Sequence, residues 1–207
     1  MSEAARRAAH IYADVSRETR ELLERYELLI QKWTRTINLV SSSTLHALRD
    51  RHILDSMQLW ELTSRRGRWV DLGSGGGFPG LVIAVLARHH DDLQVVLVEA
   101  DQRKATFLRT ALRELGLDAE VVAQRIEALP CLDADIISAR ALAPLTKLLT
   151  YTEQHRKSDG VALFPKGENA DAEIAEALES WQFDCQKHAS ITDERSIILS
   201  IGEISRV

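Results

Sequence analysis

The chain has 207 residues, of which 45% are apolar and 28% are charged, and its formal net charge is −5. This composition supports one substantial core with an appendage, and the negative charge argues against a protein that coats nucleic acid non-specifically. A local basic patch would still be enough to bind RNA.

The cysteines and the apolar segments indicate the cellular compartment in which the protein is expected. Cys131 and Cys185 are far apart and have no metal-ligand spacing, so we expect free, buried thiols in a reducing cytosol. The apolar stretches are too short to span a bilayer, and the N-terminus lacks the apolar region of a signal peptide. We therefore expect a cytoplasmic protein with no membrane partner and no metal.

Residues 1–64 are expected to form a helical N-terminal extension. Apolar residues recur at three- and four-residue steps from Leu22 to Trp33, with charged residues between them, which predicts an amphipathic helix whose stripe belongs to the core. Ser16 is placed to cap this helix. A further helix is expected through RHILDSMQLWEL at 51–62. The basic connector SRRGR at 64–68 leads into the main domain.

Residues 65–207 are expected to form an α/β domain. Strands are expected at 68–72, 93–100, 119–124, 134–140 and 160–167, helices at 79–90, 102–115, 144–155 and 169–181, and two final strands at 181–191 and 195–204. Alternating strands and helices predict a mainly parallel sheet that is covered on both faces. The last two strands have no helix between them, so they should form an antiparallel hairpin.

A glycine-rich loop follows the first strand, in WVDLGSGGGFPGLVIA at 69–84. Five of the eight residues from Gly73 to Gly80 are glycines, and Gly75, Gly77 and Gly80 match the spacing G-x-G-x-x-G. Such a loop presents backbone N–H groups and a helix N-terminus to a ligand at the crevice of an open α/β sheet. The alternative is that the glycines only permit tight packing between strand and helix. No G-K-[ST] follows, which argues against a P-loop.

Two acidic residues limit the classes of ligand that the loop could bind. Glu99 ends the second strand, where a carboxylate can accept both ribose hydroxyls of an adenosine, unless it is only a surface residue. Asp71 ends the first strand. It is placed either to attract a cationic ligand group, directly or through water, or to cap the N–H groups of the loop itself.

The pattern D-x-G-x-G-x-G at Asp71–Gly77 resembles the first motif of class I methyltransferases, and Glu99 resembles their ribose-binding acid. This resemblance covers residues 68–207. It implies a Rossmann-like mixed sheet of seven strands with an antiparallel C-terminal hairpin. It also implies S-adenosyl-L-methionine as cofactor, with S-adenosyl-L-homocysteine as product.

A narrower resemblance rests on five stretches in order: RHILDS, GSGGGFPG, QRIEALP, ISARALAPL and FPKG. Together they resemble the bacterial small-subunit rRNA methyltransferase G family, also called glucose-inhibited division protein B. The resemblance implies methylation of N7 of one guanine in a decoding-region loop of 16S rRNA, free or in an assembling small subunit. Its cofactor contacts correspond to Gly73, Phe78, Ile126, Glu127 and Arg140, beside the loop glycines Gly75 and Gly77.

Guanine N7 carries a free lone pair at neutral pH, so the expected chemistry is positioning rather than proton removal. Arg140 could hydrogen-bond guanine O6 or a phosphate, or form a structural ion pair. Lys166 could hold a phosphate or be a solvated lysine. The RHILDS segment is expected to dock the helical extension onto the main domain.

Local basic groups are expected to contact RNA, although a charged cluster taken alone is more often a solvated face. These groups are Arg51, Arg65, Arg66, Arg68, Arg103, Lys104 and Arg140. Two rival functions stay open at this point. One is a nicotinamide-dependent oxidoreductase, which would need a second nucleotide-binding half. The other is a non-catalytic RNA-binding or ribosome-assembly protein. We expect a monomer with no obligate protein partner.

Overall fold

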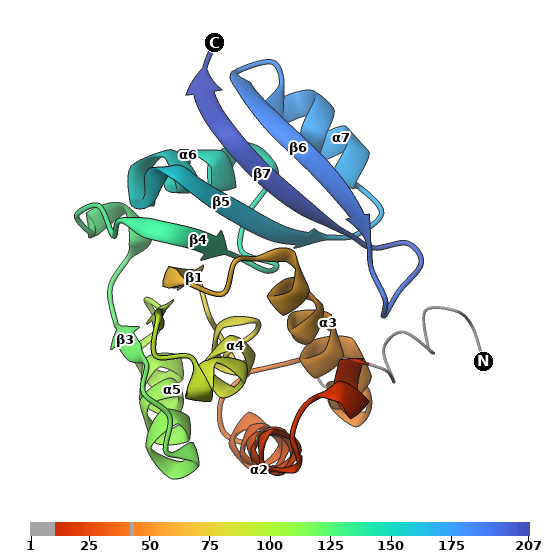
Figure 1. The fold of residues 1–207 in the computed structure, drawn as a ribbon, viewed down its shortest axis with the longest axis vertical. Helices are drawn as coiled ribbons and strands as arrows, with labels where there is room; N and C mark the ends of the chain where they lie inside the picture. The colour runs from red at the N-terminus through yellow and green to blue at the C-terminus, as the bar shows by residue number, and fades with distance from the viewer. Residues whose placement is uncertain (1–10, 42–43) are drawn as a thin grey trace.

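A computed structural model describes residues 11–41 and 44–207 of the chain. Its centre is a seven-stranded sheet in the order β3-β2-β1-β4-β5-β7-β6 (Figure 1). Strands β1 to β5 run parallel to one another, and β7 pairs antiparallel with both β5 and β6. The predicted mixed sheet and its terminal hairpin are confirmed.

The elements follow the predicted alternation closely. The strands are β1 (Gly67–Leu72), β2 (Leu93–Val98), β3 (Glu120–Val122), β4 (Ala134–Ser138), β5 (Arg156–Lys166), β6 (Trp181–Ala189) and β7 (Ile197–Arg206). The helices are α2 (Arg17–Thr34), α3 (Leu54–Met57), α4 (Gly80–Leu86), α5 (Gln102–Leu115), α6 (Leu145–His155) and α7 (Ala170–Ala177). Strand β5 begins four residues earlier than expected.

The two faces of the sheet carry separate apolar clusters, because successive strand residues point to opposite sides. Trp69, Val95 and Ile136 pack with α2, α3, α4 and α5 on one face. Val70 and Ile137, one residue further along their strands, pack with α6 and α7 on the other. In Figure 1, the helices of the first face lie in the lower half of the view, and α6 and α7 lie beside β5–β7.

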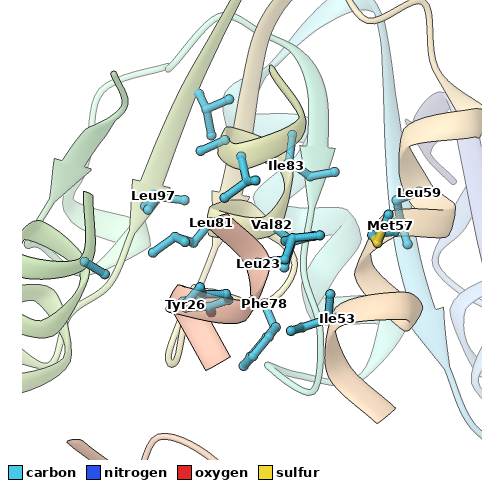
Figure 2. Close-up of a cluster of buried hydrophobic side chains, with 14 of the residues drawn as sticks. Leu23, Tyr26, Ile53, Met57, Leu59, Phe78, Leu81, Val82, Ile83 and Leu97 are labelled. Carbon is cyan, nitrogen blue, oxygen red and sulfur yellow. The ribbon is translucent and has the colours of Figure 1, made fainter. Parts of the chain in front are cut away.

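The helical extension has no core of its own within the described residues. Ser16 Oγ accepts a hydrogen bond from the backbone N–H of Thr19 at 3.1 Å, which confirms the predicted cap. Leu23 and Tyr26 of α2 lie in the same cluster as Leu81 and Val82 of α4 (Figure 2). The apolar stripe is therefore core, as predicted, and the boundary at residue 64 stays a prediction.

The segment that contains RHILDS is helical but irregular. It passes from a π-helix at Arg49–Ile53 through α3 into a 3-10 helix at Gln58–Leu62. A second correction concerns the cysteines. Both are free, but Cys131 is exposed and Cys185 is only partly buried, so the expectation of two buried thiols was wrong.

No helix in the ranges 11–41 and 44–207 is both long enough and apolar enough to cross a membrane.

Candidate functional site

The glycine loop joins β1 to α4 and has one packed side and one open side. Gly77 has a φ of +94°, and a Cβ there would lie 2.7 Å from Tyr26 Oη and 2.8 Å from Leu81 Cβ. Gly75 has a φ of +56°, but the nearest atom to its Cβ position would be the Gly73 carbonyl oxygen at 3.7 Å. Packing therefore requires glycine at 77, whereas room for a ligand lies at 75.

Gly73 lies under the loop that follows β4. Its φ is +67°, and a Cβ would come within 2.5 Å of Leu142 Cδ1. The close approach shows that the β4–α6 loop lies directly against the glycine loop. Gly73 and the ISARALAPL segment, which are both expected to contact the cofactor, therefore lie next to each other, and the contact with the cofactor stays a prediction.

Glu99 lies at the carboxyl end of β2 and faces the glycine loop. Its Oε2 accepts a hydrogen bond from the Gly75 N–H at 2.8 Å, and its Oε1 accepts one from the Asp101 N–H at 2.8 Å. Each carboxylate oxygen has two lone pairs, so one acceptor site per oxygen remains. Glu99 is thus a nearly buried loop-holding residue, and its contact with a ribose stays a prediction.

Asp71 is completely buried beneath the loop. Its Oδ2 accepts from the Gly80 N–H at 3.1 Å, and its Oδ1 accepts from Ser138 Oγ at 2.7 Å. Desolvation raises the pKa of Asp71 to about 6, although the hydrogen bonds from Ser138 and Gly80 oppose the shift. This arrangement matches the capping alternative. A direct contact with a cationic ligand is not open to an enclosed carboxylate.

Phe78 follows the third glycine of the motif and forms the centre of an aromatic cluster. Its ring centroid lies 5.3 Å from that of Tyr26 and 5.1 Å from that of His52, which belongs to RHILDS. Figure 2 shows Tyr26 and Phe78 side by side beneath α4. Burial, together with the positive charges of Arg140 and Arg51, lowers the pKa of His52 to about 4. At neutral pH, His52 is therefore an uncharged ring.

Arg140 comes from the loop after β4 and completes the Phe78 cluster. Its guanidinium carbon lies 5.0 Å from the Phe78 ring centroid, in cation–π geometry. Its Nη1 lies 3.4 Å from Asp55 Oδ2 and 3.4 Å from the Arg51 carbonyl oxygen. The structural ion pair that was one of two predictions for Arg140 is present, and it includes the RHILDS aspartate.

The turn expected to hold an adenine, Ile126–Ala128, is fastened by α6. His155 Nε2 lies 3.1 Å from the Ile126 carbonyl oxygen, and Tyr151 donates its hydroxyl to Glu127 Oε1 at 2.5 Å. Burial and the hydrogen bond to Glu127 raise the pKa of Tyr151 to about 12. The prediction missed Tyr151 and His155. Their four-residue spacing, with Lys147 before them, was the signal that places them on one helical face.

An open cleft of about 680 Å³ lies next to the β4–α6 loop, whose Leu142 approaches Gly73. It is bounded by the β4–α6 loop, the end of β5, the start of β7 and α7, through Asp55, Arg140–Pro144, Pro165–Gly167, Asn169, Glu173, Glu176, Ser196 and Ile197. Lys166 lines this cleft but is neither solvated nor free. Its Nζ lies 2.6 Å from Glu173 Oε2 and 3.2 Å from the Ala143 carbonyl oxygen, and its side chain is only 8% exposed.

The basic connector lies far from this cleft. Arg68 is at the amino end of β1 and Arg65 precedes the strand, so at least five residues, or about 17 Å of strand, separate them from Gly73. Arg65 pairs with Glu61 at 2.8 Å and Arg68 with Glu120 at 3.4 Å. The connector is therefore not part of the site. Among the described residues, no group of three His, Cys, Asp or Glu side chains is arranged to hold a metal ion.

The strand order and the loop site define the class of protein. This is the fold of class I S-adenosylmethionine-dependent methyltransferases. Among solved structures it is similar to an S-adenosylmethionine-dependent methyltransferase from Aquifex aeolicus, with a TM-score of 0.59 at 12% identity over 75% of this chain and 92% of the other. It is also similar to a ribosomal protein L11 methylase from Lactobacillus delbrueckii, with a TM-score of 0.58 at 21% identity over 75% and 79%.

The sequence comparison is more specific. Residues 19–198 match the profile of GidB, described as rRNA small subunit methyltransferase G, and the chain belongs to this family. It is 48% identical to the ribosomal RNA small subunit methyltransferase G of Cereibacter sphaeroides strain ATCC 17029, over 94% of this chain and 95% of that one. The protein of the same name from Rhizobium meliloti is also 48% identical, over 93% and 92%.

The predicted family, fold and cofactor are therefore confirmed. The residues fit S-adenosylmethionine: open space lies beside Gly75, acceptor sites remain on Glu99, and the apolar Ile126 sits in the turn that follows β3. A nicotinamide-dependent oxidoreductase is excluded by membership of a methyltransferase family.

Proposed function

We propose that this protein transfers a methyl group from S-adenosylmethionine to N7 of a guanine in the decoding-region loop of 16S rRNA. The match to the rRNA small subunit methyltransferase G family over residues 19–198 carries the proposal. The names of the relatives support small-subunit rRNA as the substrate. The protein would then act in the cytoplasm, where ribosomal subunits are assembled.

The site residues have distinct proposed roles. The backbone of Gly73, Gly75 and Gly77 approaches the cofactor closely, and Glu99 accepts hydrogen bonds from its ribose hydroxyls. Ile126 and the backbone at Glu127 hold the adenine. Asp71 acts indirectly, because its hydrogen bonds set the conformation of the loop.

Phe78 and Arg140 form the wall between the cofactor and the cleft. The cleft of about 680 Å³ is large enough for an unstacked purine, which must leave its neighbours to reach the methyl group. Arg140 lines this cleft and is placed to donate to guanine O6 or to a flanking phosphate.

Guanine N7 is a target atom that suits a site in which several carboxylates are already engaged. S-adenosylmethionine supplies an electrophilic methyl group, and N7 attacks it with a lone pair that bears no proton. A base would assist the loss of a proton when an amino or hydroxyl group is methylated, and three carboxylates near the site are already engaged. Asp71 is enclosed, Asp55 pairs with Arg140, and Glu173 pairs with Lys166. Positioning and exclusion of water are then the tasks of the chain.

The decisive experiment uses small subunits from cells that lack this protein. Incubation with the purified protein and labelled S-adenosylmethionine should label 16S rRNA, and cleavage specific for N7-methylguanosine should map the label to the decoding-region loop. Label on proteins, or on rRNA at another atom, would disprove the substrate assignment. Calorimetry that found no binding of S-adenosylmethionine would favour the assembly role instead.

A further inference from the structure

Asp55 connects three parts of the chain that are far apart in sequence. Its Oδ2 faces Arg140 Nη1 at 3.4 Å in the β4–α6 loop. Its Oδ1 accepts from Thr192 Oγ1 at 3.2 Å, in the turn before β7, and from Gln58 Nε2 at 2.9 Å. The two oxygens therefore have separate tasks: one holds the terminal hairpin and the other faces the arginine.

Arg140 is held at one end only. Both hydrogen bonds found for its guanidinium within the described chain use Nη1, to Asp55 and to the Arg51 carbonyl oxygen. The flat face of the guanidinium lies over Phe78. Its remaining N–H donors, on Nη2 and Nε, are left for a ligand. Arg140 also lines the cleft.

We propose that Asp55 is the positioning residue of this site, and that it fixes the guanidinium of Arg140 against Phe78 so that the free donors face the substrate. The proposal rests on the function proposed above, in which Arg140 contacts the target nucleotide.

The physical basis is the mobility of arginine. A free arginine side chain samples many rotamers, and holding it in one costs conformational entropy. A carboxylate at one end of the guanidinium restricts these rotamers before the substrate arrives, which improves positioning in the transition state. Both side chains are mostly buried, at 18% exposure for Arg140 and 14% for Asp55, so solvent weakens the pair less than at a surface. Burial raises the pKa of Asp55, and the nearby Arg140 opposes that shift.

The variant Asp55→Asn separates the two tasks. Asparagine keeps an oxygen acceptor for Thr192 and Gln58, but it turns an NH2 donor toward the guanidinium. With small subunits as substrate, we expect kcat/KM to fall about 10- to 100-fold, because a misplaced catalytic group has costs of this order. Calorimetry with S-adenosylhomocysteine should show a loss of affinity no larger than that of Arg140→Met.

Two controls distinguish positioning from folding. Thr192→Val removes a contact to the other oxygen of Asp55 and should leave kcat/KM within about threefold of wild type. In the Arg140→Met background, Asp55→Asn should have almost no further effect, since the group that it positions is gone. Should Asp55→Asn fold poorly, Asp55→Ser is the second variant, and the same double-mutant comparison with Arg140→Met is made.

The outcomes are clear in each direction. Non-additive losses from Asp55→Asn and Arg140→Met, with Thr192→Val near wild type, would support the proposal. Full additivity, or equal losses from Asp55→Asn and Thr192→Val, would overturn it and leave Asp55 a structural residue. If wild-type protein methylated no rRNA, the proposed function would fail. The resonance of the Arg140 Nε–H group, sharp in wild type and broadened in Asp55→Asn, would still test the positioning.

Discussion

Tyr26 of the N-terminal helix α2 donates its hydroxyl proton to the backbone carbonyl of Gly76, in the middle of the glycine loop. The two residues are 50 positions apart, and Tyr26 is fully buried. Its ring also lies against Phe78. The helical extension therefore forms the floor of the cofactor loop, and a change in α2 should be felt at the site.

We expect Tyr26→Phe to destabilise the protein by about 1–3 kcal/mol, because it leaves the buried Gly76 carbonyl without its donor. Denaturant unfolding measures this loss. Tyr12→Phe is the matched control, since the buried Tyr12 hydroxyl has no partner among the described residues, and its change should stay within about 0.5 kcal/mol. Similar losses in the two variants would show that the Gly76 contact contributes nothing.

The glycines of the loop should separate binding from stability. Gly77→Ala places a Cβ in contact with Leu81 and forces a positive φ, so we expect a destabilisation of about 2 kcal/mol or more. Gly75→Ala meets no atom closer than 3.7 Å, so its cost should be about 1 kcal/mol, from the left-handed backbone alone.

The added methyl group at position 75 should nevertheless weaken S-adenosylhomocysteine binding at least about tenfold, because it occupies the open side of the loop. Calorimetry and thermal unfolding on the same samples make the comparison. Gly116→Ala, which has open space and a φ of +65° at the end of α5, is the control for both measurements. Unchanged affinity in Gly75→Ala would place the ligand elsewhere.

The features of the fold that could be predicted are those that depend on patterns among residues close together in the sequence. Strand residues such as Val95 and Val96 alternate between two apolar faces, and α5 ends at Leu115, as predicted, with Gly116 after it in the left-handed conformation. The loop glycines and Glu99 were found because strand ends in a parallel sheet share one edge. These signals need only a few neighbouring residues.

The unpredicted part depends on contacts between distant segments. The contact of Lys166 with the Ala143 carbonyl and the enclosure of Asp71 by Ser138 arise only when β4 and the loop after it come to lie beside β5 and β1. The π-helix through RHILDS has no simple period of its own. The sequence placed Asp71 correctly at the end of β1 but could not choose between a ligand contact and a cap.

The raised pKa of Asp71 predicts how stability depends on pH. The pKa is about 6 in the folded protein and 3.8 in the unfolded chain, so between these values the folded state binds more protons. Stability therefore falls as pH rises from about 4 to 6, by up to about 3 kcal/mol for a shift of this size.

Asp71→Asn has no such ionisation. The unfolding free energy of Asp71→Asn minus that of wild type should therefore increase from about pH 4 to pH 6 and level off above about pH 6.5. Urea titrations of both proteins at four or five pH values test this. A difference that is independent of pH would mean that Asp71 keeps an ordinary pKa and that the enclosure is solvated in solution.

The contact between His155 and the Ile126 carbonyl predicts a distant effect on the cofactor. His155 is fully buried, and burial lowers its pKa, so a neutral ring donates from Nε2 to the turn that is proposed to hold the adenine. His155→Leu removes the donor at similar volume. We expect it to lose about 1–3 kcal/mol of stability and to weaken S-adenosylhomocysteine binding several-fold, because the turn at Ile126 is no longer fastened.

His155→Gln carries an amide donor that can take the place of Nε2, and it should recover most of the affinity. If both variants bind like wild type, the turn is held without His155, and the α6 side chains have no part in the cofactor site.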